Sequence, residues 1–137
     1  RAWWKVQAAY SYLKVVGQRT GDALADFQIS AFERSAPKHQ ISLQNDFRLA
    51  QDLRLNVRLR YNSSTAHYTV NNAEMTRLPS YVGLDARLGW QWSRQTELSL
   101  SGRNLLKDRH TEFINILPFT RAYDVQRSVL AQAVIRF

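Results

Sequence analysis

Side chains that could catalyse a reaction or bind a metal are few and scattered in this sequence. There is no cysteine, which excludes a disulfide framework, a thiolate metal site and a cysteine nucleophile. The three histidines, His39, His67 and His110, lie in or beside stretches without a regular pattern. His110 and Glu112 come nearest to a metal-binding pair, but an exposed loop is the favoured interpretation. The sequence therefore predicts a protein that is not an enzyme and that has no catalytic residue, metal site or cofactor.

Arginines are better candidates for function, because several alternate with apolar residues and so share one face of a strand. The five arginines in such positions are Arg54, Arg58, Arg60, Arg87 and Arg103. They could attract an anionic ligand. The favoured alternative is that they bond acidic residues of a neighbouring strand or of another domain.

The net charge is +8 and the pI is about 10.3, from 19 Lys and Arg against 11 Asp and Glu. One interpretation is a partner such as nucleic acid or an anionic surface. The favoured one is a fragment of a membrane protein whose arginines face water. The basic residues form no long run and alternate with leucines, which is not typical of a nucleic-acid-binding tail.

Six stretches alternate apolar and polar residues with the period of a β-strand. They comprise residues 4–12, 38–49, 53–61, 79–92, 97–103 and 127–137. Strands of this length, near ten residues, match what is needed to cross a bilayer at a tilt. The mean hydropathy of −0.42 and the lack of a long apolar run indicate no membrane helix, but they do not exclude membrane strands.

Short turns and long connections alternate between these strands, as in outer-membrane barrels. The long connections are residues 13–37, 62–78 and 107–126, and we expect them to be loops. A short projecting hairpin is a further option in the first, where Ala25, Phe27, Ile29 and Ala31 alternate with polar residues. The predicted fold is an all-β, antiparallel up-and-down meander of about six long strands.

No Lys, Arg, Asp or Glu occupies the apolar face of the predicted strands, and aromatic residues lie at its two ends. The predicted interfacial girdle has Trp4, Phe47, Trp92 and Phe137 at one rim and Tyr12 and Tyr61 at the other. Asn104 interrupts the apolar stripe, and we expect it near the outer edge of the apolar band. The chain opens inside a strand pattern without an initiating Met, so we expect it to be a piece of a longer protein.

Three stretches resemble the barrel of TonB-dependent outer-membrane receptors. LPSYVGLDARLGWQWSRQTELSLSGRNLLKDRHTEF, residues 78–113, is similar to the family's penultimate hairpin, including Asn104 to Leu106 followed by Lys107 and Asp108. RSVLAQAVIRF, residues 127–137, resembles its last strand with a terminal phenylalanine, and SAPKHQISLQNDFRLAQDLRLNVRLRY, residues 35–61, the preceding hairpin.

The resemblance implies a transmembrane barrel of about 22 strands that surrounds a plug domain in the bacterial outer membrane. It implies energy-coupled uptake of a scarce ligand such as a ferric siderophore or cobalamin. Residues 1–137 would form the C-terminal segment, without the plug, the energy-coupling box and about sixteen earlier strands. The implied partners are outer-membrane lipid, the rest of the barrel and its plug, a TonB-type energy-coupling protein and the barrel assembly machinery, with no nucleic acid.

The resemblance also implies roles for individual residues. Val129, Ile135 and Phe137 would form the signal that the assembly machinery reads, and the five arginines would face the lumen. The candidates for ligand contact in the loops are Tyr68, Met75, His110, Glu112, Phe113 and Phe119.

A soluble basic β-module that binds nucleic acid or another polyanion is the alternative from a different class. It requires aromatic side chains beside the arginines, where bases could stack. Only Tyr81, Trp3 and Tyr68 are placed for this, which makes the alternative weak.

Overall fold

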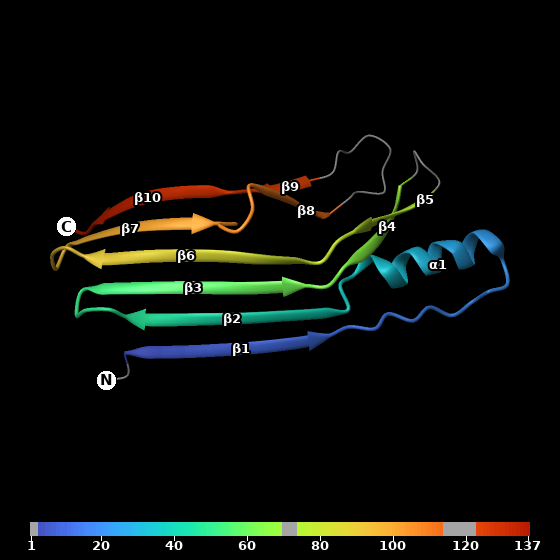
Figure 1. The fold of residues 1–137 in the computed structure, drawn as a ribbon, viewed down its shortest axis with the longest axis horizontal. Helices are drawn as coiled ribbons and strands as arrows, with labels where there is room; N and C mark the ends of the chain where they lie inside the picture. Colours follow the sequence, from blue (N-terminus) through green and yellow to red (C-terminus); the bar gives the residue numbers. More distant parts are fainter. Residues whose placement is uncertain (1–2, 70–73, 114–122) are drawn as a thin grey trace.

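The computed structural model describes residues 3–69, 74–113 and 123–137, and its main feature is one antiparallel sheet (Figure 1). The sheet has six strands in the order β1-β2-β3-β6-β7-β10, each paired with the next. They are β1 (Trp4–Tyr12), β2 (His39–Arg48), β3 (Leu53–Asn62), β6 (Tyr81–Gln91), β7 (Thr96–Arg103) and β10 (Ser128–Ile135). The predicted meander of six strands is confirmed.

Two predicted strand ends shift by two residues, and the others agree to within one. β6 begins at Tyr81 and not at Pro79, because proline has no N–H to donate to the ladder. We expected Phe137 to be the last residue of the final strand. β10 instead ends at Ile135, and Phe137 lies beyond it and is fully exposed.

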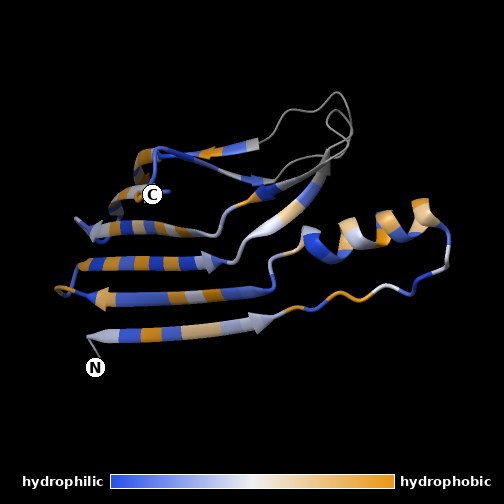
Figure 2. Cartoon of the chain, turned by 45° about the vertical axis from the view of Figure 1, so that its right-hand side comes forward, coloured by the Kyte–Doolittle hydropathy of each residue, from blue (hydrophilic) through white to orange (hydrophobic). Residues whose placement is uncertain are grey.

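The strand register collects the apolar side chains on one face of the sheet. Leu59 lies between Leu43 of β2 and Leu84 of β6, and Leu88 lies between Leu55 and Leu100. Figure 2 shows the result as alternating hydrophobic and hydrophilic bands along the strands. Because side chains alternate between faces, each apolar band belongs to one face and each polar band to the other. We call these the apolar face and the polar face.

The described residues form no layer over the apolar face. Leu78 is the only buried hydrophobic residue in the described part of the chain, and it lies outside the six-stranded sheet. Leu100 is 51% exposed and Val129 is 65% exposed, although both lie within strands. A soluble domain of this size would bury such side chains in a core. The hydrophobic partner of this sheet must therefore lie outside the chain.

The connection after β1 contains a helix, α1 (Ala23–Ser35), where we predicted a loop with an optional hairpin. Asp22 starts the helix, since its carboxylate accepts a hydrogen bond from the Ala25 N–H at 2.8 Å. Asp26 lies in the first turn and Arg34 in the last, where each charge suits the helix dipole. The prediction was wrong because the alternation through residues 25–31 outweighed these capping signals. Within the described residues, α1 falls short of the length and apolarity that a membrane-spanning helix needs.

The segment before α1 is tied to the helix. Gly17 lies so close to Ile29 that a Cβ atom at this glycine would be 2.2 Å from Ile29 Cγ2. The Gly17 N–H donates to Glu33 Oε1 at 2.9 Å, and Arg19 pairs with Glu33 at 2.8 Å. The Gly17 hydrogen bond and the Arg19 charge hold the pKa of Glu33 below its ordinary value.

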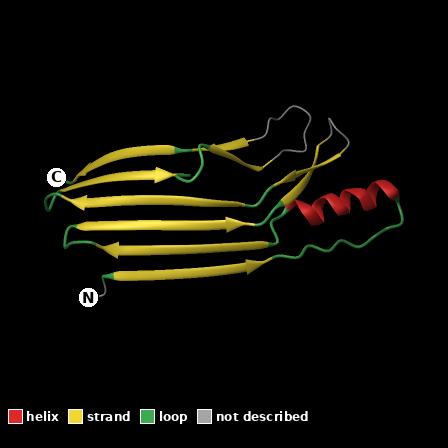
Figure 3. Cartoon of the chain, in the orientation of Figure 1, coloured by secondary structure: helices red, strands yellow, loops and turns green. Residues whose placement is uncertain are grey.

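Two hairpins lie in the other long connections, where we predicted loops without strands. They are β4 (Thr65–Thr69) with β5 (Glu74–Leu78), and β8 (Arg109–Phe113) with β9 (Tyr123–Gln126). Strands of four or five residues are too short for a sustained sequence period, which explains the omission. All the long connections lie at one end of the sheet, and the short turns lie at the other (Figure 3). The predicted asymmetry of the connections is confirmed.

His67 is buried in the first of these hairpins, with 5% of its surface exposed. Its Nε2 lies 2.9 Å from the Thr65 hydroxyl. Burial lowers the pKa of His67 below its ordinary value, because the charged imidazolium is poorly solvated there.

Asn104 does not lie on the apolar face at the outer edge of the apolar band, where we expected it. β7 ends at Arg103, and Asn104 has a left-handed backbone, with φ of 52°. In the register of β6 and β7, residue 104 would lie opposite Leu84. Instead the Leu105 N–H bonds the Leu84 carbonyl at 2.9 Å, so the chain contains one extra residue here, as in a β-bulge. The Leu105 side chain covers Gly102, where an added Cβ would be 2.7 Å from Leu105 Cδ2. Leu105 thus takes the apolar-face position, and Asn104 is buried at 3% exposure.

The two central alanines of β1 give a matched test of the two faces. Ala8 lies opposite Leu43 on the apolar face, and Ala9 lies opposite Ser42 on the polar face. If the apolar face contacts lipid, Ala8→Arg in the intact protein should cost roughly 2–4 kcal/mol of folding free energy, because it places a charge near the bilayer centre. Ala9→Arg should cost little. Urea unfolding in lipid vesicles measures both, and equal costs would contradict the assignment of the faces.

His67 predicts a pH dependence of the β4–β5 hairpin. In an open hairpin the imidazole takes up a proton near the ordinary pKa of 6.5, whereas in the folded hairpin it does so only at lower pH. Stability is therefore complete above that ordinary pKa and is lost as the pH falls through it towards the folded value. The mobility of a nitroxide at Arg77→Cys should rise over this window. It should stay constant in His67→Gln, which cannot titrate; the same rise in that variant would show that another group is responsible.

Candidate ligand-contact surface

Every Asp, Glu, Lys and Arg of the six long strands lies on the polar face. Seven of these residues are basic and three are acidic. The basic residues are Lys5, Arg48, Arg54, Arg58, Arg60, Arg87 and Arg103, and the acidic ones are Asp46, Asp85 and Glu97. The polar face therefore carries an excess of positive charge that its own strands do not neutralise.

Two of the five predicted arginines pair with carboxylates on adjacent strands. Arg60 contacts Asp85 at 3.0 Å, and Arg87 contacts Glu97 at 2.7 Å. These pairs are partly exposed, and each is worth little for stability on its own. Their main effect is to fix the direction of the side chains and to neutralise two of the arginines locally.

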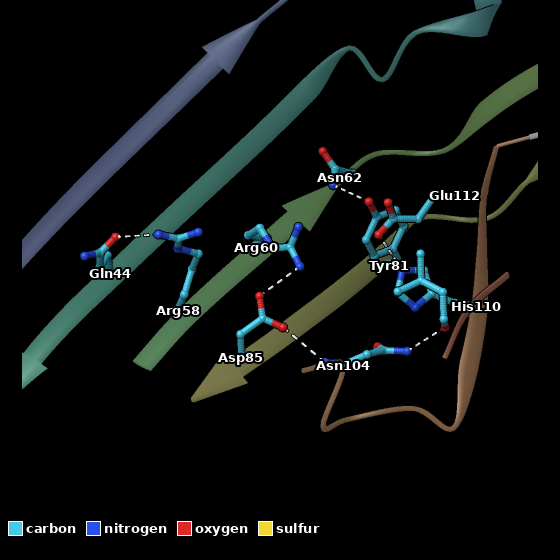
Figure 4. Close-up of polar contacts among 10 residues, drawn as sticks. Gln44, Arg58, Arg60, Asn62, Tyr81, Asp85, Asn104, His110 and Glu112 are labelled. Carbon is cyan, nitrogen blue, oxygen red and sulfur yellow. Dashed lines mark hydrogen bonds and ion pairs between the residues drawn. The ribbon is translucent and has the colours of Figure 1, made fainter. Parts of the chain in front are cut away.

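The other three predicted arginines have no carboxylate partner among the described residues. Arg58 donates to Gln44 Oε1 at 3.1 Å, a neutral acceptor (Figure 4). Arg58 and Arg103 line a cavity of ≈ 350 Å³ on the polar face, together with the paired Arg87 and Asp85. Arg54 lies nearer the end of the sheet with the short turns. Arg54, Arg58 and Arg103 are therefore the cations of the predicted set that remain available to an anion.

A polar cluster lies at the other end of the polar face, where the long connections begin (Figure 4). Asn62 and Tyr81 are opposite each other in the register, and the Asn62 amide donates to the Tyr81 hydroxyl at 2.7 Å. The ring of His110, from hairpin β8–β9, lies 4.3 Å from the Tyr81 ring between centroids. His110 Nε2 bonds Glu112 Oε1 at 2.8 Å. The sheet and the outer hairpin thus contribute together to one cluster.

A second cavity, of ≈ 320 Å³, opens beside this cluster. Tyr81, Glu112 and Asn62 line it, and so does His67 of the β4–β5 hairpin. Ser35, the last residue of α1, also lines this cavity. The aromatic and amide groups of the sheet therefore meet the imidazole and carboxylate groups of the two hairpins at one opening.

The remaining predicted loop contacts divide into three groups. His110 and Glu112 belong to the cluster. Tyr68, Met75 and Phe113 lie on β4, β5 and β8, respectively, and Phe119 lies outside the described residues. Among the described residues, no three His, Cys, Asp or Glu side chains are grouped to hold a metal ion.

The predicted girdle residues lie on or next to the ends of their strands. Trp4 stacks on Phe47 with ring centroids 6.2 Å apart, and Trp92 stacks on Trp90 at 5.6 Å. At the opposite rim, Tyr12 lies 5.2 Å from the ring of His39, while Tyr61 faces Ile41 across the ladder. Val129 and Ile135 of the predicted assembly signal lie on β10, opposite Gly102 and Thr96.

Several polar residues with defined contacts were missed from sequence, on both faces of the sheet. Asn45 is a polar residue on the apolar face, and its Oδ1 accepts a hydrogen bond from the Trp4 indole at 3.1 Å. Its position between Leu43 and Phe47 in the stripe was a usable signal. Asn62, Asp85 and His67 carried no such signal, because their partners come from other strands and connections.

The sequence matches the family model described as TonB dependent receptor-like, beta-barrel, over residues 1–105. No match is found among the curated proteins. Among solved structures, the ferric-catecholate import receptor Fiu from E. coli K12, in its closed form, has a TM-score of 0.78 and 21% identity, covering 100% of this chain and 19% of that one.

Two further structures give similar values. The ferripyoverdine receptor of the outer membrane of Pseudomonas aeruginosa has a TM-score of 0.75 and 16% identity, covering 98% of this chain and 18% of that one. The siderophore receptor PiuA from Acinetobacter baumannii has a TM-score of 0.69 and 22% identity, covering 96% and 19%. At these identities the likeness shows the fold, and this chain spans about a fifth of the length of each structure.

The match to the family model covers most of the chain, and the sheet, the bare apolar face and the one-sided long connections agree with it. The alternation of the strands then has its explanation, since an outer-membrane barrel presents its apolar face to lipid. The chain therefore belongs to the TonB-dependent receptor-like β-barrel family and forms part of a transmembrane β-barrel of the bacterial outer membrane.

Proposed function

We propose that this chain is the C-terminal barrel segment of a receptor that takes up a ferric siderophore of net negative charge, with energy coupling through a TonB-type protein. The family membership supports a receptor. The similar structures named above include a ferric-catecholate import receptor and a receptor bound to ferripyoverdine. In this role the protein is a transporter and not an enzyme.

The observation that carries the proposal is the excess of basic side chains on the polar face. The polar face carries seven basic residues and only three carboxylates. Arg54, Arg58 and Arg103 have no carboxylate partner in the described part of the chain. A ferric tris-catecholate is an anion, because its deprotonated oxygens outweigh the charge of the iron. Guanidinium groups bind such oxygens with charge-assisted hydrogen bonds, and a basic surface raises the local concentration of an anion. Cobalamin lacks that charge, so we favour a siderophore.

The polar cluster of Asn62, Tyr81, His110 and Glu112 would be the first contact of the ligand. Tyr81, His110 and Glu112 line or adjoin the opening that the long connections form, and they offer a ring surface, hydrogen-bond donors and an acceptor. Tyr68, Met75, Phe113 and Phe119 remain candidates from the same connections. Sites with a few placed polar groups and aromatic surface are typical of organic ligands.

The remaining partners follow from the unpaired edges of the sheet. Within the described residues, β1 pairs only with β2, and β10 pairs only with β7. Backbone groups at a sheet edge cannot stay unpaired in hydrocarbon, so further strands must continue the sheet on both sides. We propose that the rest of the barrel supplies them, that a plug occupies the polar side, and that lipid covers the apolar side. Val129, Ile135 and Phe137 would then be the signal for the barrel assembly machinery.

A polyanion-binding module is not supported by the placement of the tryptophans. Trp4 and Trp90 lie on the apolar face, on the opposite side of the sheet from the arginines. No base could stack on them while its phosphates contact the arginines.

Ligand binding to the intact receptor tests the proposal with a matched pair of double variants. Arg58→Gln with Arg103→Gln removes two cations that lack a carboxylate partner. Arg87→Gln with Glu97→Gln removes an ion pair without changing the net charge. The first variant should bind a ferric tris-catecholate about tenfold more weakly, equivalent to about 1.4 kcal/mol, and the second should bind it nearly as the parent does.

Salt and a neutral ligand complete this test. The difference between the two variants should shrink at high ionic strength, because salt screens the exposed arginines. Binding of cobalamin or a neutral ferric hydroxamate in preference to the anionic chelate would contradict the proposed ligand class. Equal affinities of the two variants for the tris-catecholate would contradict the role of the arginines.

A further inference from the structure

The root of the outer hairpin β8–β9 is an unusual point in the backbone. Asn104 follows directly after β7, and it is the only non-glycine residue with a positive φ among those described. Asparagine tolerates this conformation better than most residues, and glycine adopts it without steric cost. The side chain of Asn104 is nevertheless almost completely buried, at 3% exposure. A residue needed only for its backbone conformation would not have to be buried.

The buried side chain holds the hairpin by its backbone. Asn104 Nδ2 donates a hydrogen bond to the Val125 carbonyl at 2.9 Å. Val125 lies in β9, opposite His110 in β8, so this bond acts on both strands of the hairpin. It joins residues that are far apart in the chain, and its loss would leave a carbonyl without this buried donor.

The same residue is anchored on the sheet side through Asp85. The Asn104 N–H donates to Asp85 Oδ1 at 3.1 Å, while Asp85 Oδ2 accepts from Arg60 at 3.0 Å. One continuous set of polar contacts therefore runs from Arg60 on the polar face through Asp85 and Asn104 to Val125 in the hairpin (Figure 4). Because both carboxylate oxygens of Asp85 are engaged, rotation of this side chain would break a contact.

The hairpin has a second contact with the sheet through its aromatic ring. The His110 ring lies against Tyr81, whose hydroxyl is held by Asn62. The two rings are inclined at 35°, and the His110 side chain is largely buried. A ring contact is less directional than a hydrogen bond. The bond from Asn104 to Val125 acts at the root of the hairpin and has the directional geometry to set the hairpin's angle.

We propose that Asn104 is a positioning residue, which sets the orientation of hairpin β8–β9 at the opening beside the polar cluster. Its side chain holds hairpin β8–β9 in the orientation that brings His110 and Glu112 to Tyr81, and Asp85 and Arg60 anchor it on the polar face. This inference goes beyond the proposed function, since it concerns the position of the hairpin and holds for any ligand.

Asn104→Gly separates the two roles that this residue could have. Glycine keeps the left-handed backbone and the N–H that bonds Asp85, but it lacks the amide that bonds Val125. In the intact receptor, nitroxides at Lys38→Cys and Gln126→Cys report the distance between the outer end of β2 and the hairpin. Both positions are exposed. The parent should give one narrow distance distribution, and Asn104→Gly should lose that narrow peak.

Asn56→Ala is the matched control. Asn56 lies in β3, and its amide, like that of Asn104, donates to a neighbouring strand, in this case to Asp46. None of its described contacts involves the hairpin. Its distance distribution should remain that of the parent. A broadened peak in this control as well would overturn the specific role of Asn104 in favour of general loosening of the sheet.

A narrow, unshifted peak in Asn104→Gly would overturn the proposal, because the backbone conformation alone would then place the hairpin. If that variant does not assemble, Asn104→Asp tests the same bond, since a carboxylate tolerates the left-handed backbone but cannot donate to Val125. Siderophore affinity is measured separately in the same samples. A lost narrow peak with unchanged affinity supports Asn104 as the positioning residue and counts only against the hairpin as a ligand contact.

Discussion

No described residue of this chain covers the apolar face of the sheet, and most of the structure depends on this constraint. Each strand carries its apolar residues at alternate positions, and the register aligns them into one continuous surface. With Leu78 as the sole buried hydrophobic residue described, that surface cannot be stabilised from within the chain. Lipid is the solvent that makes such a face favourable, because it replaces water without requiring a protein core.

The same constraint separates the charges and determines where function can lie. All charged side chains of the six strands are confined to the polar face, since a charge in hydrocarbon is costly. On that face the basic residues outnumber the carboxylates. At the end of the sheet where the long connections begin, the Tyr81 ring and the Asn62 amide of the sheet meet His67 and Glu112 from the hairpins at one opening. The proposed ligand contacts therefore lie on the polar face and at the end of the sheet where the long connections begin.

The alternation of apolar and polar residues predicted the six-stranded sheet well, but it did not predict helix α1, the two short hairpins or the bulge at Asn104. Leu53–Asn62 was evident because its period extends over ten residues. Helix α1 was missed because its start depends on one capping contact, from Asp22 to the Ala25 N–H. The bulge at Asn104 defeated a strict count in twos, since one inserted residue moves the apolar position to Leu105. The arginines were placed on the correct face, but the contacts of Arg60 and Arg87 depend on register, which a single sequence does not give.

Accessibility along β3 tests the central claim most directly. Single nitroxides are introduced at residues 53–62 of the intact receptor in lipid vesicles, and their collision rates with oxygen and with a water-soluble nickel complex are compared. Oxygen concentrates in lipid, so the account predicts high oxygen collision rates at Leu53, Leu55, Val57, Leu59 and Tyr61 and low rates at the residues between them. Uniformly low oxygen collision rates along the strand would mean that protein covers the apolar face, and would contradict the account.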